Sequence, residues 1–404
     1  NINIIKPDYF IKGYEYSSKK NLKTVNEIKV VKNYGGKVIF SPGDLIFSSS
    51  NLKERNNLSL PVERVRDIMS SEKFNFDDII NTINDFKKVK VHVVGDTIID
   101  AYHECLLLGQ TNKTPTFSIK KLNTQKFIGG AALVAKHLKS LGANVEFTSV
   151  LGKDDKAKYV LEQLKKSKIK SNIIFDELRP TTFKERYWYN NYKMLQVDEL
   201  DNNIITDEKI FKIAKFLKKK TDLIVFSDFR HGIFNSLTIN FFQDNMFRKS
   251  VKVADSQVSN RWGNILDFKK FDILYPNEKE ARFSIGDQDS SLRPLGEKLL
   301  KKSQAKNIIL KLSERGAMCF KKGGLKPKEF FSVDSFAQSV KDGVGAGDAL
   351  LSSSSLAYVL TKNIALSLII GNFSAAIACS QKGNFPVTKT ELINFIKKID
   401  SYSN

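Results

Sequence analysis

The sequence is 404 residues long, and its 41% of hydrophobic and 11% of aromatic residues can form one large domain with a smaller one, or two ordinary domains. This content of apolar residues excludes a wholly disordered chain. The three cysteines, Cys105, Cys319 and Cys379, are too few and too scattered for a disulfide framework, which indicates a reducing compartment, the cytoplasm. The four histidines are equally scattered and give no metal-ligand spacing.

The net charge of +21 is compatible with binding to nucleic acid. The basic residues are mostly lysines, however, and they are spread along the whole chain among many asparagines and isoleucines. We therefore interpret the charge as a solvated lysine-rich surface that helps to attract anionic substrates, and we expect no nucleic-acid partner. A nucleic-acid-binding protein is the alternative, and it would show a steep salt dependence of its affinity.

The most apolar run of the sequence, Ile364 to Cys379, is broken by two serines, a glycine and an asparagine. A membrane-spanning helix needs about 20 consecutive, mostly apolar residues. We therefore expect a buried helix here and no membrane segment. The first residues, from Asn1, are polar and lack the pattern of a cleavable signal peptide.

Two sections with different patterns are joined by a charged stretch. The first section, residues 1–57, places a short apolar strand at Val38 to Phe40 before a Pro-Gly turn and three serines. Residues 58–88 follow, with apolar residues at helical spacing, namely Phe76, Ile79, Ile80, Ile83 and Phe86. That spacing predicts an amphipathic linker or entry helix, ahead of a second domain over residues 89–400.

The second section predicts strands that alternate with helices. Its first strand is VKVHVVGD, Val89 to Asp96, and a glycine turn with a helix follows in GGAALVAKHLKSLGA, Gly129 to Ala143. Further expected strands are NVEFTSVLG, DLIVFSDF, VKVADS, FDILYPN and NIILKLS, and KYVLEQLKKS is expected to be a helix. The alternation predicts an α/β fold with an open, mostly parallel sheet and helices on both faces.

In such folds ligands bind beyond the carboxyl ends of the strands, where this sequence carries polar residues. These residues are Asp96, Asp228, Asp255, Asn277 and Ser313. Two stretches, residues 116–122 and 181–199, break the rhythm because they are extended, alternating and charged. We expect them to form a small β lid that keeps water out of the site.

The stretch KDGVGAGDAL, Lys341 to Leu350, places three glycines and two carboxylates ahead of an apolar run. The glycines allow the backbone to approach a ligand, and the N–H groups and dipole of a helix N-terminus suit a phosphate. Asp348 lies in that first turn. One interpretation is a carboxylate that interacts with the helix dipole. The other is a general base that accepts the proton of an attacking hydroxyl group during phosphoryl transfer.

Three further motifs accompany this loop. Asp96 and Asp100 in GDTIID are expected on the loop after the first strand, either to accept hydrogen bonds from sugar hydroxyls or as ordinary turn residues. The glycines of GGAALVA stand at a helix start. Asn277 and Glu280 in PNEKEAR share one face of a helix start. The pair suits water-mediated Mg²⁺ near nucleotide phosphates, or it forms a capping box.

These motifs, in this order and spacing, resemble the PfkB/ribokinase family of carbohydrate kinases over residues 89–399. The resemblance is greatest to the sugar-kinase half of bifunctional proteins of the ADP-heptose synthase (RfaE) type. That half carries a GD-xxx-D start, GGAA-xVA, an SD-xxx-G strand end, PN-xxE, GAGD and a late G-x-xPVT. Here the strand end is SDFRHG, the late motif is GNFPVT, and TTFKER resembles the lid region. The resemblance implies a ribokinase-like α/β fold.

The resemblance implies roles for residues at the matching positions. Asp348 is implied as the catalytic base, and the anion hole comprises Gly345, Ala346 and Gly347. The implied nucleotide-binding residues are Asn277, Glu280, Lys311, Ser313, Gly316 and Asn372. Of these, Asn277 and Glu280 are implied to organise Mg²⁺ through water. Asp342 matches the position that helps to hold a monovalent cation, K⁺, in related kinases.

On the acceptor side, the implied substrate-binding residues are Asp96, Asp100, Gly129 and Gly130. Lys184 and Arg186 in the lid either meet a phosphate group already on the sugar or are exposed lid charges. Three departures affect this side. Leu133 stands where the family usually has Asn, His231 where it has Lys, and Asp255-Ser256-Gln257 replaces a DPK segment. The phosphate side therefore matches the family better than the acceptor side.

The first section resembles the closing third of a cytidylyltransferase-like nucleotidyltransferase domain, on the stretches IIKPDYFIKGYEY, GGKVIFSP and SSSN. The HxGH element that binds the triphosphate lies earlier in that fold, and HxGH is absent from this sequence. Nucleotidyl transfer by this chain is therefore not expected. Together with the missing initiator methionine, the remnant indicates an N-terminally incomplete sequence of a bifunctional protein. We interpret Lys12 and Ser48 to Ser50 as structural residues here.

The sequence thus predicts an ATP-dependent carbohydrate kinase, a transferase that phosphorylates a sugar or sugar phosphate. A heptose-phosphate-like acceptor is favoured, in the synthesis of nucleotide-sugar or surface-polysaccharide precursors. The alternative is a kinase-fold module that binds nucleotide or sugar but has lost acceptor chemistry, as Leu133 and His231 would allow. The expected partner is a small-molecule substrate, and a homodimer is one compatible assembly.

Overall fold

The structure, a computed structural model, describes residues 2–13, 22–41, 59–111, 113–190, 192–258, 264–323 and 330–401. It divides into two compact units, Asn1–Asn56 and Asn57–Asn404. The elements of the first unit are α1 (Ile2–Ile5), β1 (Tyr9–Gly13), α2 (Leu22–Asn33) and β2 (Lys37–Ser41). Strands β1 and β2 pair in parallel, as a connection through a helix allows.

Within the first unit, the side chain of Lys12 has internal partners. It forms an ion pair with Glu27 of α2, and its Nζ donates a hydrogen bond to Thr24 Oγ1 at 3.2 Å. These contacts connect strand β1 to helix α2. The serines of the first section, Ser48 to Ser50, lie outside the described residues.

A nine-stranded sheet forms the centre of the second unit, in the order β15-β14-β13-β12-β11-β10-β3-β6-β7. Its strands are β3 (Lys90–Gly95), β6 (Asn144–Gly152), β7 (Lys170–Asp176), β10 (Leu223–Asp228), β11 (Val251–Ser256), β12 (Ile273–Leu274), β13 (Asn307–Lys311), β14 (Ala317–Lys321) and β15 (Phe330–Val333). From β7 to β13 the neighbours are parallel, and only β14 and β15 run antiparallel. The predicted open, mostly parallel sheet is confirmed.

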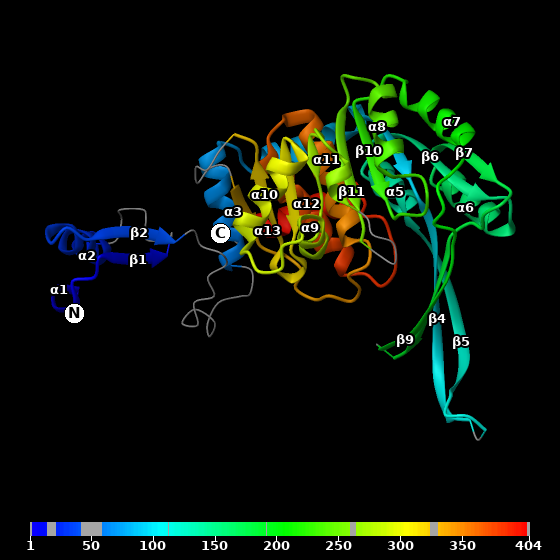
Figure 1. Cartoon of the computed structure of the whole chain (residues 1–404), viewed down its shortest axis with the longest axis horizontal. Coiled ribbons are helices and arrows are strands. Elements are labelled where there is room, and N and C mark those ends of the chain that lie inside the picture. The colour runs from blue at the N-terminus through cyan, green and yellow to red at the C-terminus, as the bar shows by residue number, and fades with distance from the viewer. Residues whose placement is uncertain are drawn as a thin grey trace. The chain divides into compact units, whose positions relative to one another are not determined.

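Helices cover both faces of this sheet, as Figure 1 shows. They are α3 (Ser59–Glu72), α4 (Phe76–Asn84), α5 (Ala131–Ser140), α6 (Asp155–Lys166), α7 (Asp207–Leu217), α8 (Ser236–Asn245), α9 (Glu278–Ile285), α10 (Leu292–Ser303), α11 (Ala346–Thr361), α12 (Ile364–Cys379) and α13 (Lys389–Ser401). In β10, Leu223 and Val225 belong to one hydrophobic core, whereas Ile224 and Phe226 belong to a second core. This alternation follows from the two-residue period of a strand that is buried on both faces.

The stretch predicted as a linker packs into the second unit instead. Phe76, Ile79 and Ile83 of α4 are buried in the same core as α11, α12 and α13. Arg64 of α3 also pairs with Asp334, just after β15, at 2.9 Å. Because its apolar face meets a core, the amphipathic pattern of this stretch marks a covering layer and not a spacer.

A separate four-stranded sheet, in the order β5-β4-β8-β9, projects from the body of the second unit (Figure 1). Its strands are β4 (Thr97–Gln110), β5 (Phe117–Gly130), β8 (Phe183–Tyr189) and β9 (Tyr192–Glu199). The sequence predicted extended segments at 116–122 and 181–199, but it missed β4. The prediction that Asp100 lies on a loop is therefore wrong, since Asp100 is a residue of β4. The first half of β4 is buried on both faces and shows no alternation that would mark a strand.

The apolar run at the end of the sequence forms helix α12, with bounds that match the predicted buried helix. Its residues belong mostly to the main core of the second unit. Among the described residues, no helix is both long and apolar enough to cross a membrane.

Candidate active site

Polar residues gather at one edge of the central sheet, where its parallel strands end. Asp96 directly follows β3, and Asp228 ends β10. Asp255 stands near the end of β11, opposite Ser227 of β10. Lys311 ends β13, forms a β-bridge with Asn277, and its backbone N–H donates to Pro276 O at 2.8 Å. The parallel order of the strands therefore brings residues from distant parts of the sequence to one edge.

Helix α11 begins at this edge with the predicted glycine loop. Gly345 precedes the helix with a φ of +82°, a left-handed conformation that favours glycine. A Cβ atom at Gly345 would lie 3.2 Å from Leu133 Cδ2, so the loop packs on the side chain of Leu133. A Cβ atom at Gly347 would lie 3.5 Å from Lys311 Nζ. The N-terminus of a long helix and a lysine ammonium group thus lie together, which suits an anion.

Asp348 lies in the first turn of α11. Burial raises the pKa of Asp348 to about 7, and the nearby carboxylate of Asp255 adds to this shift while Lys311 opposes it. Asp100 also raises this pKa. Its partner Asn384 connects it to the start of α11, because Asn384 Oδ1 lies 3.9 Å from the point that a Cβ atom on Gly345 would occupy. A carboxyl group with this pKa can both accept and release a proton near neutral pH.

Lys311 and Asp255 form a close ion pair beside Asp348. Lys311 Nζ lies 2.6 Å from Asp255 Oδ2, and both side chains are largely buried. Burial lowers the pKa of Lys311, but Asp255 and Glu280 together raise it above its ordinary value, so the ammonium group is charged. Burial raises the pKa of Glu280 to about 7, against the opposing effect of Lys311.

Asn277 and Glu280 form the capping box that was one of the two alternatives for this pair. Asn277 Oδ1 accepts from the Glu280 N–H at 2.8 Å, and Glu280 Oε2 accepts from the Asn277 N–H at 2.7 Å. The box fixes the start of α9 next to Lys311. Among the described residues, no group of three or more His, Cys, Asp or Glu side chains could hold a metal ion.

An open pocket of about 950 Å³ extends from Asn277 and Lys311 along the turn after β13. Ser313 and Arg315 of that turn line it together with residues of α9. Gly316 ends the turn with a φ of +83°, and a Cβ atom there would lie 2.1 Å from Val333 O. The size of the pocket is in the range of sites that bind small molecules.

The projecting sheet β5-β4-β8-β9 is called the lid below. Asp100 is the centre of a second group of residues, at the base of this lid. It forms an ion pair with Arg186 of β8, and its Oδ2 accepts a hydrogen bond from Asn384 Nδ2 at 2.8 Å. A Cβ atom at Gly129 would lie 2.4 Å from Asp100 Oδ2, so only glycine leaves room for this carboxylate. Lys184 stands opposite Asp100 in the register of β8 and β4. Two cations and one carboxylate thus face one another beneath the lid.

Asp342 connects the glycine loop to this group. Its Oδ1 accepts from the Val344 N–H at 3.0 Å, and its Oδ2 accepts from the Gly383 N–H at 3.2 Å and from Tyr102 Oη at 3.3 Å. The guanidinium of Arg186 lies over the ring of Tyr102, 5.5 Å from its centre. Asp342 therefore joins three segments that border the site.

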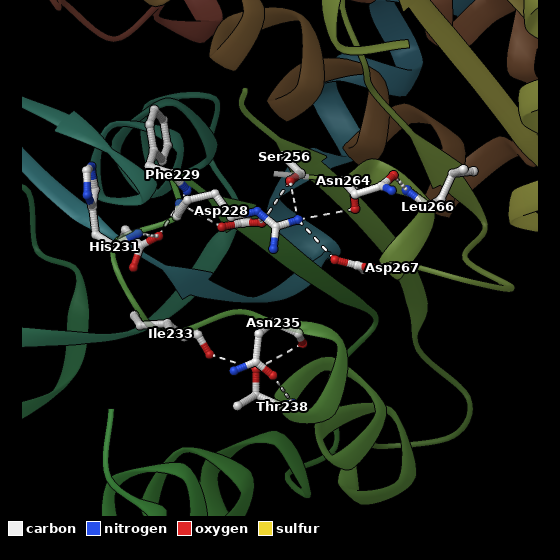
Figure 2. Close-up of polar contacts among 12 residues, drawn as sticks. Asp228, Phe229, His231, Ile233, Asn235, Thr238, Ser256, Asn264, Leu266 and Asp267 are labelled. Carbon is white, nitrogen blue, oxygen red and sulfur yellow. Dashed lines mark hydrogen bonds and ion pairs between the residues drawn. The ribbon is translucent and has the colours of Figure 1, made fainter. Parts of the chain in front are cut away.

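Asp96 and the loop after β10 form a buried network of hydrogen bonds and ion pairs, which we call the buried support. Asp96 Oδ2 accepts from the N–H groups of Phe229 and His231 at 2.9 and 3.2 Å, which turns this oxygen toward the loop. Figure 2 shows the contacts of Asp228 with its neighbours in this loop. Arg230 Nε lies 2.9 Å from Asp228 Oδ2, and Arg230 Nη2 donates to Ser256 Oγ at 3.2 Å.

The same guanidinium extends the support to the segment after β11. Arg230 Nη2 also lies 3.2 Å from Asp267 Oδ2 and donates to Asn264 O at 3.2 Å. Farther along the loop, Thr238 Oγ1 donates to Ile233 O at 2.9 Å, at the start of α8 (Figure 2). The loop is thus fixed at both ends by buried polar contacts.

The model of the pfkB family carbohydrate kinases matches residues 88–390 of this sequence. The chain belongs to this family. A curated relative, the bifunctional protein HldE of a Nitratiruptor species, is 29% identical over 77% of this chain and 66% of its own length. The chain therefore spans just under two thirds of that relative.

Solved structures of the family share the fold at low sequence identity. Ribokinase from Thermotoga maritima has a TM-score of 0.62 and 21% identity, over 76% of this chain and 99% of its own. Arabidopsis thaliana ribokinase, solved as a complex with ribose and ATP, has a TM-score of 0.60 and 18% identity, over 76% and 99% of the two chains. The predicted family and its ribokinase-like fold are confirmed.

Two departures from the pfkB family pattern have a structural explanation here. Leu133, where the family usually has Asn, is buried and supports Gly345 of the glycine loop. His231 is also buried, with Nδ1 2.8 Å from Asn202 Oδ1. Burial, assisted by Lys184, lowers the pKa of His231 to about 3, so the imidazole is neutral.

The structure brings together most of the predicted site residues and adds others. Asn372, predicted near the nucleotide, donates through Nδ2 to Leu368 O within α12, and its contacts do not connect it to the rest of the site. Asn384 and Arg230 were missed as site residues, although both lie in motifs that the sequence showed, GNFPVT and SDFRHG. Their partners are distant in sequence, so the motifs alone did not reveal the contacts.

Proposed function

We propose that this pfkB-family kinase transfers the γ-phosphoryl group of ATP to a hydroxyl group of a sugar phosphate, with a heptose-phosphate-like acceptor favoured. The observation that carries the proposal is Asp348, a carboxyl group with a pKa of about 7 in the first turn of α11. It follows a glycine loop that reaches both the phosphate side and the acceptor side: a Cβ atom at Gly347 would lie 3.5 Å from Lys311 Nζ, and one at Gly345 would lie 3.9 Å from Oδ1 of Asn384, the partner of Asp100. A general base must occupy this position between the two reactants.

Residues of this chain account for each step of the transfer. Asp348 accepts the proton of the attacking hydroxyl as the new bond between that oxygen and the γ-phosphorus forms. The bond from the γ-phosphorus to the leaving oxygen of ADP breaks in the same step. The N–H groups of the glycine loop at residues 345–347 donate to the transferring oxygens. Bound ATP supplies the phosphoryl group, and Mg²⁺ would neutralise part of its charge.

The residues of this region indicate where cations would bind. The carboxylate of Glu280 and the amide of Asn277 are oxygen donors of the type that Mg²⁺ prefers, through water. Asp255 Oδ1 is buried and has no hydrogen-bond partner among the described residues, so it is available to a water molecule of such an ion, while Oδ2 binds Lys311. For a monovalent cation such as K⁺, we propose the region of Asp342.

The choice of a phosphorylated acceptor rests on the lid base. Arg186 and Lys184 lie next to Asp100, and burial lowers the pKa of Lys184 even though Asp198 and Asp100 oppose the shift. A guanidinium and an ammonium group at this position would neutralise a phosphate group on the sugar. The sugar itself would hydrogen-bond to Asp100, beside Gly129 and Gly130.

The cellular context follows from the same proposal. We assign residues 57–404 to the kinase and the first unit to the end of a cytidylyltransferase-like domain of a bifunctional protein. Such a protein would supply precursors of nucleotide sugars or surface polysaccharides in the cytoplasm.

The test is phosphate transfer from radiolabelled ATP to a panel of heptose and hexose phosphates, for the wild type, Asp348→Asn and Asp289→Asn. Asp289 is exposed and serves as the matched control. Loss of the base lowers kcat by roughly 10²–10⁴-fold, whereas the control keeps wild-type turnover. Unchanged turnover of Asp348→Asn excludes it as the base. Binding of ATP without phosphorylation of any acceptor supports the alternative, a nucleotide-binding module.

A further inference from the structure

We infer that Lys311 is a catalytic residue whose ammonium group stabilises the phosphoryl group during transfer, and that Asp255 is the positioning residue that holds it there. The inference deepens the proposed function and rests on it for the identity of the reaction. It assigns to Lys311 a role in the transfer step, beyond a place at the border of the nucleotide.

The position of the ammonium group is the first support. Lys311 ends β13, and its Nζ lies 3.5 Å from the point that a Cβ atom on Gly347 would occupy. Gly347 belongs to the anion hole at the start of α11, so the ammonium group lies against the backbone that would bind the transferring phosphoryl group. A larger residue at position 347 would contact the lysine side chain in the same space.

The hydrogen-bonding capacity of Lys311 is the second support. An ammonium group has three N–H donors, and Asp255 Oδ2 takes one of them at 2.6 Å. Among the residues that the structure describes, no other hydrogen bond from Lys311 Nζ is found. Two donors are therefore available to an incoming anion, although the side chain is only 15% exposed. Phosphoryl oxygens are acceptors that use such donors.

The charges around Lys311 are the third support. Asp255 pairs with the ammonium group at 2.6 Å, and the carboxyl groups of Asp255, Glu280 and Asp348 all raise its pKa. Without Lys311 this group of acids would repel a nucleotide phosphate. In phosphoryl transfer, charge spreads over the equatorial oxygens, and a fixed cation in a dry site stabilises it strongly.

Asp255 has a different role, because it lies one step farther from the glycine loop. Its Oδ2 binds the lysine, and the register of β11 holds its backbone beside Ser227 of β10. The carboxylate therefore restricts the rotamers of a long side chain and directs the ammonium group toward Gly347. An anion would not bind to Asp255 itself.

The alternative is that Lys311 merely neutralises the buried charge of Asp255. The variants Lys311→Gln, Asp255→Asn and the double variant separate the two roles, with acceptor turnover and thermal unfolding measured for each full-length protein. We expect kcat to fall about 10²–10³-fold in Lys311→Gln, with the acceptor KM within about threefold of the wild type. The double variant should be no faster than Lys311→Gln. Recovery of turnover in the double variant would show that the pair is structural and would overturn the inference.

The pH dependence of kcat gives an independent readout. Lys311 lowers the pKa of Asp348 and Asp255 raises it, while Asp100 is the third charged group that acts on it. Lys311→Gln should therefore move the acidic limb of the profile to higher pH, and Asp255→Asn should move it to lower pH. Lys311→Arg keeps the charge and should recover part of kcat and the wild-type limb. If the acidic limbs of Lys311→Gln and Asp255→Asn do not move in opposite directions, the roles assigned to Lys311 and Asp255 are contradicted.

A binding experiment without acceptor separates this inference from the proposed function. ADP with aluminium fluoride, a mimic of the transferring phosphoryl group, is titrated into the wild type and Lys311→Gln by calorimetry, with ADP alone as the reference. The inference predicts that the variant loses at least tenfold in affinity for the mimic and less than threefold for ADP. If the wild type phosphorylates no sugar phosphate but this difference is found, the acceptor assignment fails and the role of Lys311 stands. Equal affinities of both proteins for the mimic overturn the inference alone.

Discussion

The two sides of the proposed site, the phosphate side and the acceptor side, are built in different ways. On the phosphate side, the glycine loop, Asp348 and Lys311 stand at the start of one helix and the end of one strand. On the acceptor side, Asp100 binds Arg186, which lies 86 residues away in sequence, and Asn384, which lies 284 residues away. The first group depends on local backbone geometry, whereas the second depends on long-range packing between the lid and the body.

This difference shows where the chain can vary. The anion-binding capacity of a helix start comes from backbone N–H groups and the helix dipole, and so does not depend on the side chains that meet the acceptor. Side chains that meet across a lid can be exchanged to suit another acceptor. The two explained departures are both buried: Leu133 packs against Gly345 at the start of α11, and His231 lies in the loop after β10, beside Asn202.

The largest effect is expected at the buried support of the acceptor side. Arg230→Met leaves Asp228 and Asp267 without their cation, and breaking a buried ion pair from one side costs about 3–5 kcal/mol of stability. Urea unfolding followed by circular dichroism measures this loss. Arg248 is exposed, so Arg248→Met is the matched control and should stay within about 0.5 kcal/mol. Equal stability of the two variants would show that the network does not support the loop.

A variant of Asp100 tests whether acceptor turnover can be impaired without a change in ATP affinity. Asp100→Asn removes the charge that pairs with Arg186, and losing one partner of a buried charged pair costs about 2–5 kcal/mol. We expect kcat/KM for the acceptor to fall about 10²–10³-fold, while calorimetry gives an unchanged affinity for ATP. Glu185 lies on the same strand as Arg186 and pairs with His103, so Glu185→Gln is the control for lid stability. A parallel loss of ATP affinity in Asp100→Asn would contradict separate sides.

The sequence predicted the phosphate side better than the acceptor side for a physical reason. A glycine loop before a helix, and a capping pair three residues apart, are visible because they depend on neighbours in the chain. The partner of Asp100 is not visible in this way, because β4 is buried on both faces and its register with β8 is set by packing. Asn384 and Arg230 were missed for the same reason.

The covering helices show the same limit. The spacing of Phe76, Ile79 and Ile83 correctly predicted a helix with one apolar face. It could not show what that face meets, so the stretch was interpreted as a linker. In the structure, this face packs in the main hydrophobic core of the second unit. Periodicity therefore predicts that a face is buried, and tertiary structure decides against which element.

A smaller effect is expected at Gly129, where the acceptor side allows no side chain. Gly129→Ala places a Cβ atom 2.4 Å from Asp100 Oδ2, and relieving such a contact costs roughly 1–3 kcal/mol. The carboxylate must move from Asn384, so we expect the acceptor KM to rise about tenfold or more in steady-state kinetics. ATP affinity is the internal control. A KM within twofold of the wild type would mean that Asp100 does not contact the acceptor.

The mildest test uses pH on the wild type, because the proposed base, Asp348, is expected to titrate near neutrality. Asp348 must be ionised to accept a proton, and its raised pKa of about 7 means that the ionised fraction falls as pH is lowered through 7. Between pH 8 and pH 6 we expect kcat to fall about tenfold along a one-proton curve. Asp100→Asn, which removes a carboxylate that raises this pKa, should shift the curve only slightly to lower pH. A profile that stays flat to pH 5 would contradict Asp348 as the base.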